Sequence, residues 1–159
     1  MIRTGIGYDS HRFAEGRPLI LGGVTVPHTH GLTGHSDADA VAHALTDAML
    51  GAAAAGDIGK HFADTDARWK GADSIRLLHA AHAIVLSKGW RFVQGDVTVI
   101  CEQPKLGKHF PAMAERLAAA LDVSPEMIGL KAKTNEGMGW IGRGEGIAVL
   151  AVATLERAP

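Results

Sequence analysis

The sequence predicts one domain in which about three helices pack on one face of a mixed sheet of four to five strands. Three observations support this prediction. Apolar strand-like runs alternate with helix-like periodic segments along 159 residues, which is the length of one domain. Turn residues, among them many of the 20 glycines, separate these segments without forming a linker. The last strand is apolar on both faces, so both sides of the sheet need cover.

The N-terminal half of the chain contains the first strand, a hairpin and the first helix. The first strand is expected at 2–9, and apolar runs at 19–21 and 24–26 flank Gly22-Gly23 in a hairpin pattern. A loop at 28–35 then leads into an Ala-rich helix over 37–55, which Ser36 or Asp37 is expected to cap.

The C-terminal half alternates helices and strands. Hydrophobic spacing predicts helices at 73–87 and 111–121, and apolar runs predict strands at 95–101, 129–134 and 146–155. Ile147, Val149, Ala151 and Ala153 face one side of the last strand, whereas Ala148, Leu150 and Val152 face the other. Three helices cover one side of such a sheet. We therefore favour another subunit as the second cover, the alternative being a central strand enclosed within the monomer.

Composition excludes several classes of protein. The chain is 47% hydrophobic but has no apolar run approaching the roughly 20 residues of a membrane span. The first residues lack a signal-peptide pattern, so we expect a cytoplasmic protein. A single cysteine, Cys101, excludes an intramolecular disulfide and a Cys-rich zinc site, and we expect it to be a small buried residue at a strand end. The net charge of −1 gives no electrostatic basis for binding nucleic acid or a membrane surface.

The segment Asp9-Ser10-His11 is the strongest chemical signal in the chain. Residues two apart in a strand share a face, so Asp9 and His11 point together. His43, in the Ala-rich helix, provides a second imidazole. One carboxylate and two imidazoles would hold a tetrahedral Zn²⁺ with one open position, as in catalytic zinc sites. Asp47 follows His43 by one helical turn and is the expected carboxylate partner of its outer N–H, although an ordinary buried histidine is the alternative.

Two further segments carry polar side chains near the start of helices or in loops. His35 and Ser36 precede the first helix, where backbone N–H groups favour a phosphate, although Ser36 could act only as a cap. The loop that begins at Asp57-Ile58-Gly59 suits sugar hydroxyls or a second metal, with plain turn chemistry as the alternative. Its further candidate residues are Phe62, Asp64, Thr65 and Asp66.

Other candidates follow the strands of the C-terminal half. Strand ends in such sheets often bind ligands, and these ends carry Cys101, Gln103, Pro104 and Lys105, then Lys133, Thr134, Asn135 and Glu136. The lysines and Thr134 suit phosphate, and Glu136 suits Mg²⁺ or Mn²⁺. A Gly-rich bend at 139–146 holds Trp140 and Arg143, but no P-loop or Rossmann signature is present. His79 and His82 lack a third ligand nearby and are expected at the surface or an interface.

Taken in order, these residues form a set of motifs that spans residues 2–156. The motifs are Asp9-x-His11-x-Phe13, Leu21-Gly22-Gly23-Val24, Gly34-His35-Ser36-Asp37-x-Asp39, His43-Ala44-Leu45-Thr46-Asp47-Ala48, Gly56-Asp57-Ile58-Gly59, Phe62-x-Asp64-Thr65-Asp66, Lys70-Gly71-Ala72-Asp73-Ser74, Thr134-x-Glu136-x-x-Gly139 and Gly142-Arg143-Gly144-Glu145-Gly146-Ile147-Ala148. With this set the chain resembles the 2-C-methyl-D-erythritol 2,4-cyclodiphosphate synthase family of the non-mevalonate isoprenoid pathway. Lys133, Ala63 and Trp140 depart from the residues frequent in that family.

The resemblance implies an α+β fold, a homotrimer and active sites between neighbouring subunits. It implies that Asp9, His11 and His43 bind Zn²⁺ and that Glu136 binds Mg²⁺ or Mn²⁺. His35 and Thr134 would steady the transition state. Asp57, Gly59 and the 62–66 loop would contact the methylerythritol part of the substrate, and residues 101–107 and 133–136 its cytidine and phosphate part.

The implied reaction is intramolecular. The 2-phosphate of 4-diphosphocytidyl-2-C-methyl-D-erythritol 2-phosphate attacks the β-phosphorus and expels CMP, which makes the enzyme a phosphorus–oxygen lyase. Such chemistry needs positioning and charge stabilisation rather than a covalent nucleophile. In the family, Arg143 would lie near the threefold axis, so we hypothesise that an isoprenoid diphosphate or another small anion binds there. The alternative is that Arg143 pairs with Glu145 or another nearby carboxylate.

Overall fold

A computed structural model describes residues 1–159 as two sheets and five α-helices. The main sheet has five strands in the order β4-β1-β7-β5-β6: Gly31–Leu32, Ile2–Ala14, Gly146–Arg157, Trp90–Ile100 and Ile128–Lys133. Strands β2 (Leu19–Leu21) and β3 (Val24–Val26) form the expected hairpin. The long helices are α1 (Ala40–Ala52), α3 (Ser74–Ser87) and α4 (Phe110–Ala120), and the short ones are α2 (Ile58–His61) and α5 (Gly139–Gly142). Three 3₁₀ turns cover Ala67–Trp69, Gly107–His109 and Pro125–Met127.

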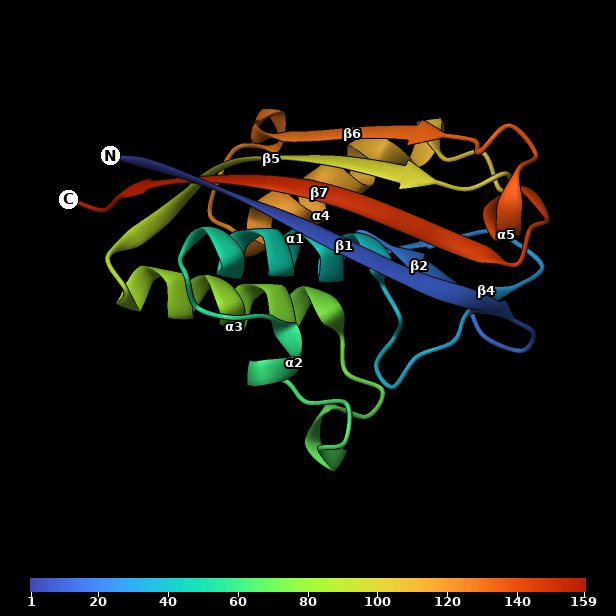
Figure 1. The fold of residues 1–159 in the computed structure, drawn as a ribbon, viewed down its shortest axis with the longest axis horizontal. Coiled ribbons are helices and arrows are strands. Elements are labelled where there is room, and N and C mark those ends of the chain that lie inside the picture. The colour runs from blue at the N-terminus through green and yellow to red at the C-terminus, as the bar shows by residue number, and fades with distance from the viewer.

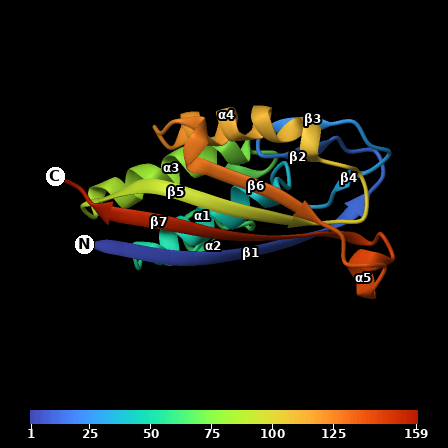
Figure 2. The same ribbon diagram turned by 90° about the horizontal axis from the view of Figure 1, so that it is seen from above.

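The sheet is mixed and the long helices cover one of its faces, as the sequence predicts. Strands β1 and β5 run antiparallel to the central strand β7, and β6 runs parallel to β5. Strands β1, β5 and β6 therefore all end at the same edge of the sheet. Figure 1 shows α1 and α3 below the strands, and Figure 2 shows no long helix on the opposite face. None of the helices is long and apolar enough to cross a membrane.

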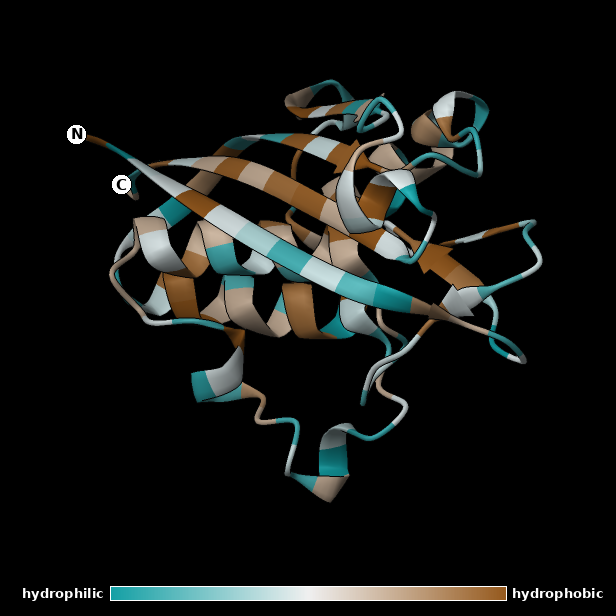
Figure 3. Ribbon diagram, turned by 45° about the vertical axis from the view of Figure 1, so that its right-hand side comes forward, coloured by the Kyte–Doolittle hydropathy of each residue, from teal (hydrophilic) through white to brown (hydrophobic).

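The two faces of β7 have different surroundings. Ile147, Val149 and Ala153 are fully buried against the helices, whereas Leu150 and Val152 on the other face each remain 39% exposed. On the adjacent β1, Ile6 is 71% exposed. Figure 3 shows β7 as largely hydrophobic along its length. The alternative in which the monomer encloses this strand on both sides is therefore wrong: the short helix α5 contacts β7, but no long helix covers Leu150 and Val152 (Figure 2).

Helix α1 lies directly against β1 because two glycines remove the side chains between them. A Cβ at Gly5 would lie 2.1 Å from the Ala48 carbonyl oxygen, and one at Gly7 would lie 1.9 Å from that of Ala44. Both distances are far below van der Waals contact, so no larger residue fits. This close approach sets the distance between His43 on α1 and the side chains at the end of β1.

The start of α1 differs from the prediction. The helix begins at Ala40 rather than near residue 37, and its cap is Asp39 rather than Ser36 or Asp37. The Asp39 carboxylate is fully buried and accepts three backbone N–H groups, those of Gly22 (2.8 Å), Gly23 (2.7 Å) and Ala42 (3.0 Å). The sequence favoured Ser36 or Asp37 because no pattern along the chain indicates that the hairpin turn donates two backbone N–H groups to Asp39. Burial raises the pKa of Asp39 to about 6, although the N–H donors oppose this rise.

We expect Asp39→Asn to lower the free energy of unfolding by about 1–3 kcal/mol, because the amide NH₂ would face a backbone N–H that then lacks an acceptor. Urea denaturation at pH 8 measures this change. Asp73→Asn is the matched control, since Asp73 is the exposed cap of α3 and accepts one N–H, from Ile75. Its cost should stay within about 0.5 kcal/mol, because asparagine is an equally good cap. Equal costs in the two variants would contradict the special role of Asp39.

Several boundaries also move. Strand β1 continues to Ala14 instead of ending at residue 9, because it pairs with β7 as far as Arg12 and then with β4. Strand β5 begins at Trp90 instead of residue 95, because it too pairs with the long strand β7. His82 was expected at the surface or an interface but is buried, 6% exposed, among the packed residues of α3. Burial lowers its pKa. Cys101 is buried at the end of β5 as expected, and burial raises the pKa of its thiol to about 11.

A candidate metal centre and active site

The structure brings Asp9, His11 and His43 together at the junction of β1 and α1. Their ligand atoms all lie within 4.8 Å of one another. Asp9 Oδ2 lies 2.8 Å from His11 Nε2 and 3.2 Å from His43 Nδ1. The side chains are mostly buried, with 13–25% of their surface exposed. They therefore face a single point that solvent can still reach.

The outer ring nitrogens of the two histidines are also held. His11 Nδ1 donates to the backbone carbonyl of Thr33 at 2.7 Å, which leaves Nε2 to face the cluster. His43 Nε2 lies 2.7 Å from the Ser74 hydroxyl. The expected partner, Asp47, does not bond to His43. It accepts the Ile58 N–H at 2.7 Å and so holds the start of α2. The prediction for Asp47 is wrong because helical spacing places two residues on one face without fixing where each side chain points.

Charges in this cluster favour the ionised forms of Asp9 and His11. Burial opposes ionisation of Asp9, but hydrogen bonds and attraction from His11 and His43 outweigh it and lower its pKa. Burial alone would lower the pKa of His11, but the hydrogen bond and the attraction to Asp9 outweigh burial and raise its pKa. A metal ion bound between these side chains would take the place of the proton that lies between His11 Nε2 and Asp9 Oδ2.

A cleft of about 360 Å³ opens from this cluster. It contains most of the candidate residues from the N-terminal half: Asp9, His11, His35, Ser36, His43, Ile58, Gly59, Phe62 and Asp64. Gly34 and Ala63, which belong to the motifs and loop identified from the sequence, also line it, together with Trp69 and Leu77, which were not selected from the sequence. Trp69 packs edge-on against Phe62, with ring centroids 5.2 Å apart. Apolar residues of this kind carry no motif that distinguishes them from core residues in a sequence.

Three candidates in the 57–66 loop do not line the cleft, and two of them have structural partners instead. Asp57 caps α2 by accepting the Lys60 N–H at 2.9 Å, and Asp66 forms an ion pair with Arg68 at 2.6 Å. Thr65 is exposed at the tip of the loop. The turn-chemistry alternative therefore describes Asp57 and Asp66 in this chain, and Ile58, Gly59, Phe62 and Asp64 are the loop residues that reach the cleft.

The loop that carries His35 and Ser36 is fixed from both sides. Arg17 donates to the carbonyl oxygens of Gly34 and Ser36, each at 2.8 Å. His35 Nε2 donates to the Asp66 carbonyl at 3.1 Å. These bonds place the His35 ring and the Ser36 hydroxyl at the wall of the cleft without relying on helix α1 alone.

The candidates of the C-terminal half form a second group at the ends of β5 and β6. A smaller cavity of about 150 Å³ is lined by Cys101, Pro104, Lys105, Lys133 and Thr134, together with Leu106, Gly107 and Ala132. Asn135 lies beside it and donates its backbone N–H to Glu102. Glu136 is exposed on the following turn at φ 54°. Gln103 lies apart, in a neighbouring depression with Arg143.

The two groups share an edge of the sheet but do not meet within one chain. Strands β7 and β5 separate β1 from β6, which corresponds to three strand spacings or about 14 Å. The two cavities have no lining residue in common. His35 and Thr134 thus belong to different cavities of the same chain.

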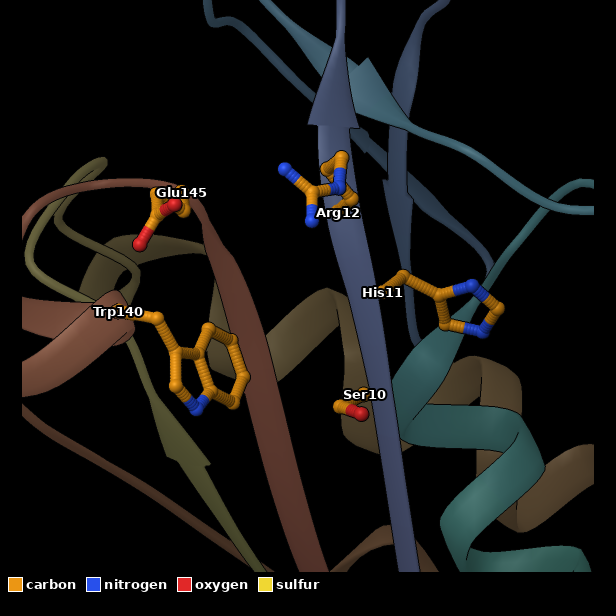
Figure 4. Close-up of a pocket in the computed structure, with 5 residues that line it drawn as sticks. All are labelled: Ser10, His11, Arg12, Trp140 and Glu145. Atoms are coloured by element: carbon orange, nitrogen blue, oxygen red, sulfur yellow. The ribbon is translucent and has the colours of Figure 1, made fainter.

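Trp140 and Arg143 lie on the outer side of the sheet. Figure 4 shows Ser10, Arg12, Trp140 and Glu145 around one depression, with His11 pointing to the opposite side of β1. Arg143 donates to Glu145 Oε2 at 2.8 and 3.1 Å. The chain therefore forms the Arg143–Glu145 pair that was the alternative to an anion site.

The donor set at the junction of β1 and α1 fits a divalent cation. One carboxylate and two imidazoles are typical ligands for Zn²⁺, and three ligands leave one coordination position open. The outer nitrogens of His11 and His43 contact the Thr33 carbonyl and the Ser74 hydroxyl. Contacts of this kind orient metal-binding histidines. No other cluster of at least three His, Cys, Asp or Glu side chains in the chain has this geometry.

Comparisons with known proteins agree on one family. Residues 2–156 match the sequence model of the YgbB family. The 2-C-methyl-D-erythritol 2,4-cyclodiphosphate synthase of Dechloromonas aromatica is 57% identical over 98% of this chain and 97% of that protein. The synthase of the same name from Synechocystis sp. is 54% identical over 97% of this chain and 96% of that protein.

Solved structures give the same result. The bifunctional IspDF from Campylobacter jejuni superposes with a TM-score of 0.95 at 45% identity, covering 99% of this chain and 42% of that longer one. A CDP-bound 2C-methyl-D-erythritol-2,4-cyclodiphosphate synthase superposes with a TM-score of 0.88 at 41% identity, covering 97% of this chain and all of the other.

Proposed function

Because this chain belongs to the YgbB family, we propose that it converts 4-diphosphocytidyl-2-C-methyl-D-erythritol 2-phosphate to 2-C-methyl-D-erythritol 2,4-cyclodiphosphate and CMP. The observation that carries the proposal is the cluster of Asp9, His11 and His43 at the open cleft. Residues 1–159 would act as one synthase domain. The relatives named above, at 54–57% identity over nearly the whole chain, support the same reaction.

The substrate brings two anionic phosphates together, and they repel each other until positive charge is supplied. Asp9, His11 and His43 would hold Zn²⁺, which would supply the positive charge that neutralises the phosphates. The Ser36 hydroxyl would donate a hydrogen bond to a phosphate oxygen, and the His35 ring, which the Asp66 carbonyl and the Arg17 bonds to its loop hold at the cleft wall, would steady the transition state. Gly59, Phe62 and Asp64 would contact the methylerythritol part in the same cleft.

The second group of residues suits the nucleotide end of the substrate. Lys105, Lys133 and Thr134 surround the small cavity beside buried Cys101 and Pro104, so the cavity combines an apolar floor with phosphate-binding side chains. Asn135 lies next to it, and Gln103 lies in the neighbouring depression with Arg143. We assign this cavity to the cytidine and its phosphates.

A homotrimer with active sites between subunits would unite the two groups. His35 and Thr134 lie in separate cavities of one chain, and the strands β1 and β6 that lead to these cavities are about 14 Å apart by strand spacing. The outer face of the sheet exposes Ile6, Tyr8, Leu150 and Val152, an apolar surface typical of a subunit interface. Packing these faces around a common axis would place the nucleotide cavity of one subunit near the metal cluster of the next.

The products of the reaction test the proposal. Purified protein incubated with the substrate, Zn²⁺ and Mg²⁺ should release CMP together with a cyclic diphosphate, and a chelator should stop both. CMP with a free monophosphate would instead indicate a phosphodiesterase that uses water. The absence of CMP under all metal conditions would indicate a zinc- or phosphate-binding protein without this activity.

Glu136 is the proposed ligand for Mg²⁺ or Mn²⁺. Its exposed carboxylate follows Thr134, whose hydroxyl accepts the Glu136 N–H at 3.3 Å. We expect Glu136→Gln to lose the response of CMP release to Mg²⁺ and Mn²⁺, because an amide is a weaker ligand for a hard cation. Bound zinc, measured by elemental analysis, should stay unchanged. A fall in zinc content would mean that Glu136 belongs to the zinc site.

The depression near Trp140 and Arg143 would lie at the trimer centre, where we propose an isoprenoid diphosphate or another small anion. The Arg143–Glu145 pair is exposed on both sides and worth at most about 1 kcal/mol, so a diphosphate could replace Glu145 as the partner. Titration with geranyl diphosphate should raise the melting temperature of the wild type more than that of Arg143→Ala. An equal response in the two proteins, or none in either, would leave Arg143 as a partner of Glu145 alone.

A further inference from the structure

Two side chains outside the metal cluster form a hydrogen-bonded chain that ends on His43. Ser74 is the first residue of α3 and is fully buried, and its hydroxyl lies 2.7 Å from His43 Nε2. The same hydroxyl donates to Asp37 Oδ1. The backbone N–H of Ser74 donates to the other oxygen of Asp37 at 3.0 Å. Asp37 thus holds Ser74 by both its backbone and its side chain.

The direction of these bonds determines which nitrogen of His43 carries its proton. A carboxylate can only accept, so the Ser74 hydroxyl hydrogen points to Asp37. The Ser74 oxygen is then left as an acceptor, and His43 Nε2 must donate to it. In the neutral ring that a bound metal requires, Nδ1 is consequently the nitrogen without hydrogen, and Nδ1 is the atom that faces the cluster, 3.2 Å from Asp9 Oδ2.

We propose that Asp37 and Ser74 are positioning residues that hold His43 in the tautomer and orientation required for binding the metal. Asp37 and Ser74 are 37 residues apart in the sequence and meet only in the fold, so no local sequence pattern links them to His43. Metal-binding histidines usually donate their outer N–H directly to a carboxylate, a carbonyl or water. Here a buried hydroxyl connects the ring to the carboxylate and excludes water from that contact.

Ser36 does not replace Ser74 in this role. Its hydroxyl also lies near His43 Nε2, at 3.2 Å, but it accepts the Ala38 N–H at 3.3 Å and bonds to no carboxylate. Nothing therefore fixes the direction of the Ser36 hydroxyl as Asp37 fixes that of Ser74. This inference rests on the proposed function in one respect, namely that the metal bound by Asp9, His11 and His43 is Zn²⁺.

Zinc affinity, measured by competition with a chromophoric chelator, tests the proposal without relying on turnover. We expect Ser74→Ala and Asp37→Asn each to weaken zinc binding by about 10- to 100-fold, the range typical for partners of metal ligands. The double variant should lose little more than either single one, because both act through the same contact. Ser74→Thr, which keeps the hydroxyl, should restore the affinity. Ser87→Ala, at the exposed other end of α3, is the matched control and should bind zinc as the wild type does.

A spectroscopic measurement separates positioning from general stability. In the zinc-loaded wild type the His43 Nε2–H should give a protected downfield proton resonance, and in Ser74→Ala this proton should exchange with water. Equal zinc affinity in the wild type and Ser74→Ala would overturn the proposal, as would an equal loss in Ser74→Thr. Failure of the wild type to bind zinc would overturn the proposed metal centre as well, so the two failures are distinguishable.

Discussion

Replacing His43 with alanine should reduce CMP release by at least about 10³-fold, the upper range for removing one electrostatic contact to a transition state. His43 Nδ1 is one of three ligand atoms at the cluster, and two remaining ligands make a much weaker zinc site. Bound zinc, measured by elemental analysis after dialysis, should fall in parallel with turnover.

The same variant should remain folded and keep the oligomeric state of the wild type. The apolar outer face of the sheet lies on the side of β1 opposite to the metal cluster, so the loss of one ligand leaves it intact. Size-exclusion chromatography with light scattering measures this directly. His79→Ala, on an exposed part of α3, should keep both zinc and turnover. Normal zinc content and near-normal CMP release in His43→Ala would refute the assignment of the site.

Gly7→Ala should be among the most damaging single substitutions in the chain, although it adds only one methyl group. The new Cβ would lie 1.9 Å from the Ala44 carbonyl oxygen and 2.8 Å from the Ala48 nitrogen, both on the backbone of α1. Backbone cannot rotate away as a flexible side chain can, so the helix must move from the sheet. We expect the free energy of unfolding to fall by about 3 kcal/mol or more. Zinc affinity should also fall, because moving α1 separates His43 from Asp9 and His11.

Gly51→Ala provides the matched control on the same helix. A Cβ at Gly51 meets no atom within 4 Å, and alanine favours a helix over glycine by about 1 kcal/mol, so this variant should be neutral or stabilised. Denaturation of both variants in urea, with chelator present, compares them without a contribution from metal. A Gly7→Ala protein as stable as the wild type would contradict the close packing of α1 on β1.

The local elements and the chemical character of the metal cluster could be predicted from the amino-acid sequence. Period-two and period-3.6 patterns depend on neighbours along the chain, so they located α3, α4, the β2–β3 hairpin and both faces of β7 within a few residues. Asp9 and His11 were linked because strand geometry places residues two apart on one face. His43 stood out because an imidazole is unusual in a helix rich in alanine.

The hydrogen-bond partners of the site residues, in contrast, depend on how distant segments pack together. Sequence spacing placed Asp47 beside His43, but the fold directs Asp47 to α2 and gives His43 Nε2 to Ser74, which lies 31 residues away. The cap of α1 passed from Ser36 or Asp37 to Asp39 because a hairpin turn donates two N–H groups to it. Likewise, the fold places His35 and Thr134 in different cavities of the chain. Hydrogen bonds have a range of about 3 Å and a strict direction, so they depend on distances between segments that no pattern along a single chain contains.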